Sequence, residues 1–149
     1  MTGTIERLTF RGEHGHDSAA QEDTIRLHRE RYGWAAERVA GKHVLDLACG
    51  VGYGSAMMAE SGAASVSGVD ISQEAIDEAT ESFQADNLRY YCSDYRLLKT
   101  DAVPVALRTA YERGFDVVVS LETIEHLPDP ADLVRVLHAG LRPGGILIA

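Results

Sequence analysis

The sequence predicts an α/β fold in which helices cover both faces of a doubly wound parallel sheet. Short apolar runs alternate with amphipathic segments from residue 42 onward, which is the pattern of consecutive strand–helix units. A glycine-rich turn follows the first apolar run, as expected where a strand passes into a helix beside a ligand. With 149 residues, the chain is long enough for one hydrophobic core and hardly for two.

Two regions are expected, an N-terminal arm with a cap helix (residues 1–41) and the main domain (residues 42–149). Residues 1–17 mix glycine, histidine and charged side chains and are predicted to form an irregular arm. His14 and His16 have the spacing of metal ligands, but no third ligand lies nearby in the sequence, so a loop is the simpler interpretation.

A helix is expected to begin at Ser18, because Ser18 and Gln21 form a capping-box pattern, and to end near Gly41. Apolar and aromatic residues recur at intervals of three and four along one face of this helix: Ile25, His28, Tyr32, Ala35 or Ala36, and Val39. Tyr32 either packs this helix onto the sheet or closes over a bound ligand.

The main domain is expected to contain five strands separated by helices. The apolar runs place the strands at 44–48, 65–69, 88–92, 115–120 and 146–148. Helices are expected around 54–61, after a Ser72 cap, at 105–112 following Pro104, and at 131–139, with a turn at 142–145 before the last strand.

Composition and charge restrict the class of protein. Hydrophobic residues make up 45% of the chain and charged residues 25%, as in ordinary globular domains. There is no apolar run of membrane-spanning length and no secretion signal, and two cysteines make no disulfide framework, which predicts a cytoplasmic protein without a membrane partner. The net charge of −9 without a Lys/Arg cluster argues against a nucleic-acid partner and suits a small cationic ligand.

The segment that carries chemistry is the glycine-rich turn at 48–54, where glycines stand at positions 50, 52 and 54. Asp70 follows the second strand twenty residues after Gly50, where a carboxylate can reach a ribose diol. A dinucleotide fingerprint would need glycine at position 55, which is Ser55. Asp46 inside the first strand would lie badly beside a pyrophosphate but well beside a cationic amino acid, which favours S-adenosylmethionine over a dinucleotide.

These segments resemble the class I S-adenosylmethionine-dependent methyltransferases. The resemblance rests on sequence blocks that occur in the same order as the motifs of that family. These blocks are 44–54, 66–72, 92–94, 115–119, 121–130 and 141–145. It implies a Rossmann-like sheet with strand order 3-2-1-4-5. The implied activity is methylation of a small molecule, most simply an oxygen of a natural product, sugar or quinone-like acceptor.

The resemblance also implies a set of cofactor-binding residues. Asp46 would lie near the methionine amino group, Asp70 would hold both ribose hydroxyls, and Asp94 would accept from the adenine amino group beside the backbone of Tyr95. Leu121 would contact the methionine end. The whole implied cofactor site is Asp46, Ala48, Gly50, Gly52, Asp70, Ile71, Asp94, Tyr95 and Leu121.

Glu122, Glu125 and His126 form a second candidate constellation. On a helical turn these three side chains would share one face. The pattern is similar to one in quinone and small-RNA O-methyltransferases, where it is associated with a divalent metal. Three roles remain open: orienting the acceptor, holding a metal, or general-base catalysis by His126, with Glu125 and His126 as the candidate catalytic residues.

The family fold implied by the resemblance continues beyond the fifth strand with two further strands. This sequence ends within that strand, at Ile146–Ala149, so its edge is expected to be covered by another polypeptide or a second copy, or the chain is a piece of a longer protein. The alternative function is therefore a non-catalytic cofactor-binding fragment or partner subunit. A dinucleotide-dependent oxidoreductase is a third, weaker alternative because of Ser55 and Asp46.

Overall fold

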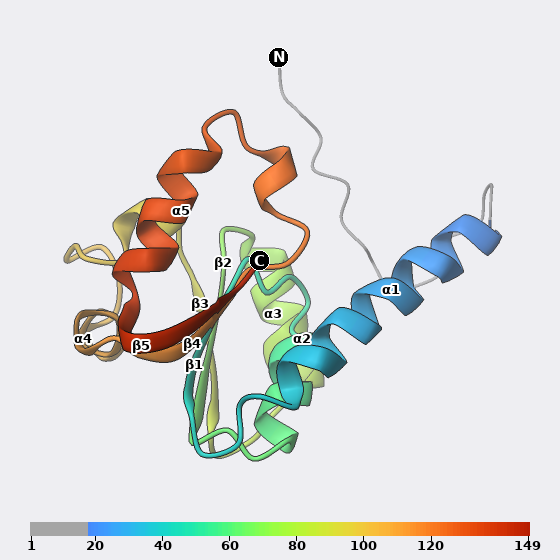
Figure 1. Ribbon diagram of the computed structural model, residues 1–149, viewed down its shortest axis with the longest axis horizontal. Helices are drawn as coiled ribbons and strands as arrows, with labels where there is room; N and C mark the ends of the chain where they lie inside the picture. Colours follow the sequence, from blue (N-terminus) through green and yellow to red (C-terminus); the bar gives the residue numbers. More distant parts are fainter. Residues whose placement is uncertain (1–17) are drawn as a thin grey trace.

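A computed structural model describes residues 18–149, with side chains described from residue 22 onward. The expected loop around His14 and His16, and the capping contact between Ser18 and Gln21, lie outside the described residues. Five strands alternate with helices in the rest of the chain (Figure 1). The helices are α1 (Ser18–Ala36), α2 (Tyr53–Glu60), α3 (Gln73–Ser82), α4 (Val105–Arg113) and α5 (Pro130–Ala139), with single 3₁₀ turns η1 (Tyr95–Leu97) and η2 (Ile124–His126).

The sheet has the order β3-β2-β1-β4-β5, and all of its pairs are parallel, as predicted. Parallel pairing places the carboxyl ends of all five strands at one edge, where a doubly wound fold binds its ligand. The strands are β1 (His43–Leu47), β2 (Ser65–Asp70), β3 (Leu88–Cys92), β4 (Phe115–Val119) and β5 (Leu141–Ile148).

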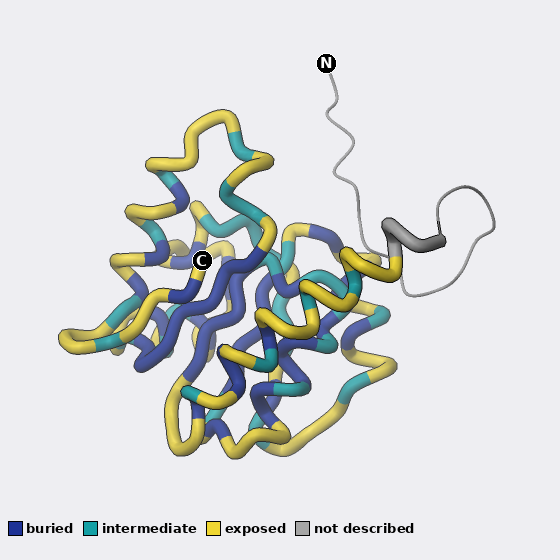
Figure 2. Tube along the Cα trace, turned by 45° about the vertical axis from the view of Figure 1, so that its right-hand side comes forward, coloured by how far each residue is buried: buried dark blue, intermediate teal, exposed yellow. Residues whose placement is uncertain are grey.

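The core consists of two apolar clusters, one on each face of the sheet. Figure 2 shows the buried stretches running along the central strands, with exposed residues on the outer sides of the helices. One cluster lies under α1 and α2 and includes Tyr32 and Met58; the other lies under α4 and α5 and includes Leu107 and Leu137. Strand β1 is buried from Val44 to Leu47. A strand buried on both faces requires helices on both faces, which explains its near-continuous apolar sequence.

The cap helix α1 is shorter than expected. It ends at Ala36, although Val39 is buried like Tyr32, Ala35 and Ala36; Ile25 and His28, nearer the start of the predicted face, are only partly buried. Gly41, expected to end the helix, lies beyond a turn, and its N–H donates to the carbonyl of Gly62 (2.8 Å). Helix α1 packs against α2, so the cap rests on the same layer that carries the glycine-rich turn (Figure 1).

Strand β5 differs from the prediction of a turn followed by a strand. It pairs with β4 at Leu141 and resumes pairing at Ile146, with a register shift between Phe115 and Val117 on β4. The predicted turn at 142–145 is therefore an irregularity inside one strand, with Gly144 at φ +80°. Strand β5 lies at an edge of the sheet and exposes Ile146 and Leu147, so a covering partner remains a prediction.

Two further features bear on the expectations from sequence. In residues 18–149, none of the helices combines the length and the apolar character of a membrane-spanning segment. Of the two free cysteines, Cys49 is buried and Cys92 is exposed. Cys92 is the last residue of β3, an edge strand, so a neighbouring strand covers it on one side only.

Candidate functional site

The structure brings the predicted site residues together at the carboxyl edge of the sheet. Backbone hydrogen bonds join the ends of the three strands that carry them. The N–H groups of Ala48 and Cys49 donate to the carbonyl of Val69 (2.7 and 3.0 Å). The N–H of Ser93 donates to the carbonyl of Asp70 (2.9 Å). The loops after β1, β2 and β3 therefore form one connected rim.

The loop between β1 and α2 has an unusual backbone. Ala48, Gly50 and Gly52 have φ values of 64°, 55° and 84°. A left-handed conformation is costly for alanine, and such residues often mark functional turns. A Cβ built on Gly50 would meet nothing within 4 Å, whereas one on Gly52 would lie 2.6 Å from the Cβ of Ala79. The Gly50 end of the loop is open, and the Gly52 end is packed against α3.

Asp70, at the end of β2, is fixed by the backbone of two loops. The N–H of Gly50 donates to its Oδ2 and the N–H of Ser72 to its Oδ1, both at 2.9 Å. Each carboxylate oxygen can accept a second hydrogen bond. The side chain is partly exposed, so it is held in place and still available to the hydroxyl groups of a ligand.

Asp46 lies inside β1, as the sequence predicted. It is completely buried, and its two oxygens accept hydrogen bonds from Tyr32 Oη (2.9 Å) and Ser55 Oγ (2.6 Å). Burial raises the pKa of Asp46 from 3.8 to about 6, while the bonds from Ser55 and Tyr32 act to lower it. The nearby charge of Asp70 contributes to the same upward shift of the pKa. Tyr32 therefore packs the cap helix onto the sheet and also holds a site carboxylate.

Asp94 is already engaged by a neighbour. Its Oδ1 accepts from the backbone N–H of Arg96 (2.9 Å), and the Arg96 guanidinium forms an ion pair with the same carboxylate. The hydrogen bonds and charge of Arg96 hold the pKa of Asp94 below its usual value. A ligand amino group at Asp94 would have to share this carboxylate with Arg96.

Two further predicted cofactor-binding residues follow Asp70 and Asp94 directly in the sequence, Ile71 and Tyr95. Ile71 is 62% exposed, and Tyr95, in η1, donates from its hydroxyl to Asp132 Oδ2 (3.3 Å). An exposed isoleucine next to Asp70 is available as an apolar surface for a ring.

The segment after β4 does not bring its three candidate residues together. Glu122, at φ 52°, forms an ion pair with Arg31 of the cap helix, while Glu125 and His126 lie in η2. His126 Nε2 is 4.0 Å from Glu125 Oε1, and both side chains are about half exposed. The expected helical face is wrong, because η2 begins only at Ile124 and Glu122 lies before it. Within residues 18–149, no three His, Cys, Asp or Glu side chains form a group that could hold a metal ion.

Leu121, expected at the methionine end, is 8% exposed and belongs to the core cluster under α1 and α2. It follows β4, directly beside β1 in the sheet. Its contact with the methionine end of the cofactor stays a prediction.

Three partners of the site were not expected from the sequence: Ser55 on Asp46, Arg31 on Glu122, and a ring cluster beside Tyr32. In that cluster the rings of His28, Tyr32 and Tyr53 have centroids 5.1 to 5.5 Å apart, and Tyr53 Oη hydrogen-bonds His28 Nδ1. Burial, followed by the charge of Arg31, lowers the pKa of His28. The recurrence of His28 and Tyr32 on one helical face was the only sequence signal for this cluster.

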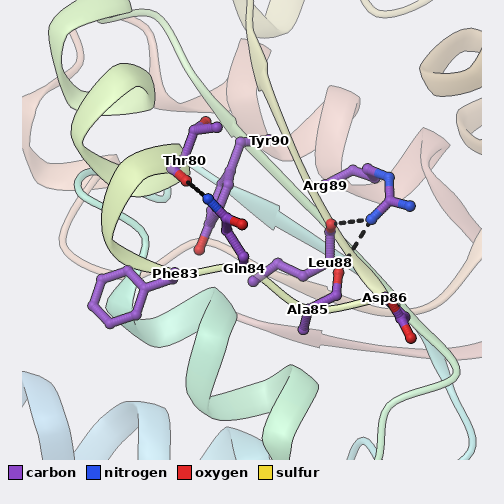
Figure 3. A pocket seen from close by; sticks show the side chains of 8 residues that line it. All are labelled: Thr80, Phe83, Gln84, Ala85, Asp86, Leu88, Arg89 and Tyr90. Atoms are coloured by element: carbon purple, nitrogen blue, oxygen red, sulfur yellow. Dashed lines mark hydrogen bonds between the residues drawn. The ribbon is translucent and has the colours of Figure 1, made fainter.

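A groove of about 440 Å³ lies away from this site (Figure 3). It is formed by the end of α3, the following loop and the first residues of β3, at the amino ends of the strands. Arg89 in its lining donates to the carbonyls of Ala85 and Leu88. The groove therefore belongs to a different edge of the sheet from the candidate site.

Comparisons with known proteins identify the family to which this fold belongs. Residues 45–149 match the family described as a methyltransferase domain. The chain is 38% identical over 109 residues to a ubiquinone biosynthesis O-methyltransferase of Coxiella burnetii, which covers 72% of this chain and 42% of that protein. The chain thus spans less than half the length of the curated relative.

Solved structures give the same result. An S-adenosylmethionine-dependent methyltransferase from Mesorhizobium loti superposes with a TM-score of 0.61 and 28% identity, over 78% of this chain and 51% of that one. One from Thiobacillus denitrificans, in complex with S-adenosyl-L-homocysteine, has a TM-score of 0.61 and 25% identity over 79% and 46%. The chain belongs to the methyltransferase domain family, with the Rossmann-like fold of the S-adenosylmethionine-dependent class.

Proposed function

We propose that this chain binds S-adenosylmethionine and takes part in methyl transfer to an oxygen of a small, quinone-like acceptor. The observation that carries the proposal is the geometry of Asp70 beside the left-handed Gly50 turn, within a segment that matches the methyltransferase family. The name of the curated relative supports a quinone-like acceptor.

The residues of the site fit the proposed cofactor. The open turn at Gly50 leaves space for a ligand to approach the backbone, and Asp70 holds its carboxylate toward the same rim. The negative charge of Asp46 and of Asp70 suits a ligand with a sulfonium and an ammonium group. Ile71 and the partly exposed carboxylate of Asp94 follow on the same rim and would receive the adenine.

S-adenosylmethionine, when bound at Asp46, Gly50 and Asp70, would supply an activated methyl group on its sulfonium for transfer to the acceptor oxygen. The chain's own task is to align the two and to remove the proton of the acceptor hydroxyl. His126 and Glu125, half exposed after β4, are the residues proposed to orient the acceptor and take that proton.

Calorimetric titration of the purified chain with S-adenosylmethionine, and separately with NAD, tests the cofactor. We expect one saturable site for S-adenosylmethionine and at least a tenfold weaker affinity after Asp70→Ala, because a charged hydrogen-bonding partner is lost. Asp86→Ala is the matched control, since this exposed carboxylate lies before β3 at the opposite edge of the sheet. Binding of NAD instead would revive the oxidoreductase alternative.

Turnover with a panel of hydroxylated aromatic acceptors then separates catalysis from binding alone. Formation of S-adenosylhomocysteine that depends on the acceptor and falls after His126→Ala supports the proposal. Tight cofactor binding without turnover on any acceptor favours the alternative of a non-catalytic cofactor-binding part or partner subunit.

A further inference from the structure

We propose that Tyr32 of the cap helix, together with Ser55 of α2, positions the Asp46 carboxylate for the ammonium group of the cofactor. The inference rests on the proposed function, because it concerns how that same site attracts its cationic ligand. It makes Tyr32 a positioning residue that acts through Asp46, and it links docking of the cap helix to occupation of the site.

The hydroxyl groups of Tyr32 and Ser55 hold the carboxylate from two different helices. Tyr32 Oη donates to Oδ1 at 2.9 Å and Ser55 Oγ donates to Oδ2 at 2.6 Å. All three side chains are buried, with at most 1% of each exposed. A carboxylate that accepts one hydrogen bond on each oxygen has a defined orientation, and donors to both oxygens favour its charged form.

Glycines provide the space for both hydroxyl donors. A Cβ at Gly54 would lie 2.3 Å from the Tyr32 ring, and a Cβ at Gly68 would lie 2.9 Å from Ser55 Oγ. Gly68 pairs directly with Asp46 across the β1–β2 ladder. The backbone therefore leaves room for these two donors where any side chain would exclude them.

The remaining groups around Asp46 do not assist its ionisation. Tyr53 of α2, Tyr90 of β3, Cys49 of the loop and Asp70 of β2 all interact with it electrostatically, and all are neutral or acidic. On the β4 side its neighbour in the ladder is Val119. The two hydroxyl donors are thus the groups that oppose the effect of burial, which raises the pKa of Asp46 to about 6.

This arrangement predicts a specific pH dependence of cofactor affinity. Affinity should fall as the pH decreases through about 6, because protonation of Asp46 removes its attraction for the ammonium group. Tyr32→Phe removes one donor to the charged form and should move this midpoint upward by about one pH unit. Ser55→Ala should shift it in the same direction from the other helix.

The test is calorimetric titration of the chain with S-adenosylmethionine from pH 5 to 8, on the unaltered chain and on these two variants. Tyr111→Phe is the matched control, because Tyr111 is also buried, donates to the carbonyl of Val136, and lies in the cluster on the other face of the sheet. The pH midpoint of cofactor affinity in Tyr111→Phe should be the same as in the unaltered chain. In an Asp46→Asn background, Tyr32→Phe should cause no further shift.

Two results would overturn the inference while the proposed function stands. One is retained binding with an unmoved midpoint in both Tyr32→Phe and Ser55→Ala. The other is tighter binding after Tyr32→Phe, which would show that the hydroxyl occupies the place of the ammonium group. Circular dichroism establishes that each variant is folded, and if Tyr32→Phe does not fold, Ser55→Ala decides the question. Absence of binding by the unaltered chain at every pH overturns the proposed function itself, and this inference with it.

Discussion

Replacing Gly52 with alanine is expected to destabilise the chain by about 3 kcal/mol. Gly52 has a φ of 84°, and a left-handed residue with a Cβ loses about 1–2 kcal/mol. The added Cβ would also lie 2.6 Å from both Ala79 Cβ and Tyr90 Oη, and relieving such overpacking costs about 1–3 kcal/mol. Tyr90 Oη donates to the Gly52 carbonyl (2.8 Å), so moving the ring disturbs that bond as well.

Gly50→Ala is the matched control in the same loop. Its φ of 55° is also left-handed, but a Cβ there meets nothing within 4 Å. Only the conformational cost applies, so we expect a loss of about 1 kcal/mol. Urea unfolding followed by circular dichroism measures both values. Equal losses for the two variants would contradict the assigned packing of Gly52 against α3 and β3.

Most of the fold could be predicted because it depends on local patterns. The apolar runs of β1 and β4 and the amphipathic α3 follow from periodicity, and Ser72 caps α3 through its hydroxyl, as expected. The error at β5 has a physical reason. Arg142–Gly145 carries turn residues, but pairing with β4 resumes beyond them, and the Arg142 guanidinium is anchored to the buried Asp116. Pairing between strands overrides the local preference of a turn.

The placement of the site was predictable for a topological reason. Parallel strands end at one edge, so residues that follow β1, β2, β3 and β4 must meet there regardless of the details of packing. The hydrogen-bond and ion-pair partners of these residues were harder to predict from the sequence. Ser55 and Tyr32 reach Asp46 only because α2 and α1 pack on the same face of the sheet, and Arg31 reaches Glu122 across 91 residues of sequence.

One partner could have been found without the structure. Arg96 stands two residues after Asp94, within reach of a carboxylate that caps a turn, and both backbone and guanidinium bonds result. The left-handed backbone at Ala48 and Glu122 left no sequence signal, because neither residue type favours it. Both follow adjacent strands, β1 and β4, so the strained positions cluster at the proposed site.

Asp46→Asn is expected to change the difference in unfolding free energy from the unaltered chain by about 2 kcal/mol between pH 4 and pH 7.5. The pKa of Asp46 is raised from 3.8 to about 6 in the folded chain, chiefly by burial. Between those two values the folded state holds a proton that the unfolded state has lost. Asp46 therefore supports folding below pH 4, and this contribution disappears as the pH rises through 6.

The measurement is the free energy of unfolding of both proteins across this range, compared as a difference. The comparison is needed because other carboxylates act with the opposite sign. Asp94, whose pKa is lowered by Arg96, favours folding at higher pH and loses this effect as the pH falls. Such groups are present in both proteins, so their contributions cancel in the difference between the two free energies of unfolding. Parallel stability profiles would show that Asp46 does not titrate in this range.

The stability of Asp46→Asn relative to the unaltered chain should therefore be higher at pH 7.5 than at pH 4. The variant should also bind S-adenosylmethionine more weakly. Asparagine keeps the size of the side chain but removes the buried charge, and its amide group cannot accept from both Tyr32 and Ser55. Stability and affinity would then change in opposite directions at one buried residue. A carboxylate retained against its own desolvation is what a site selected for a cationic ligand requires.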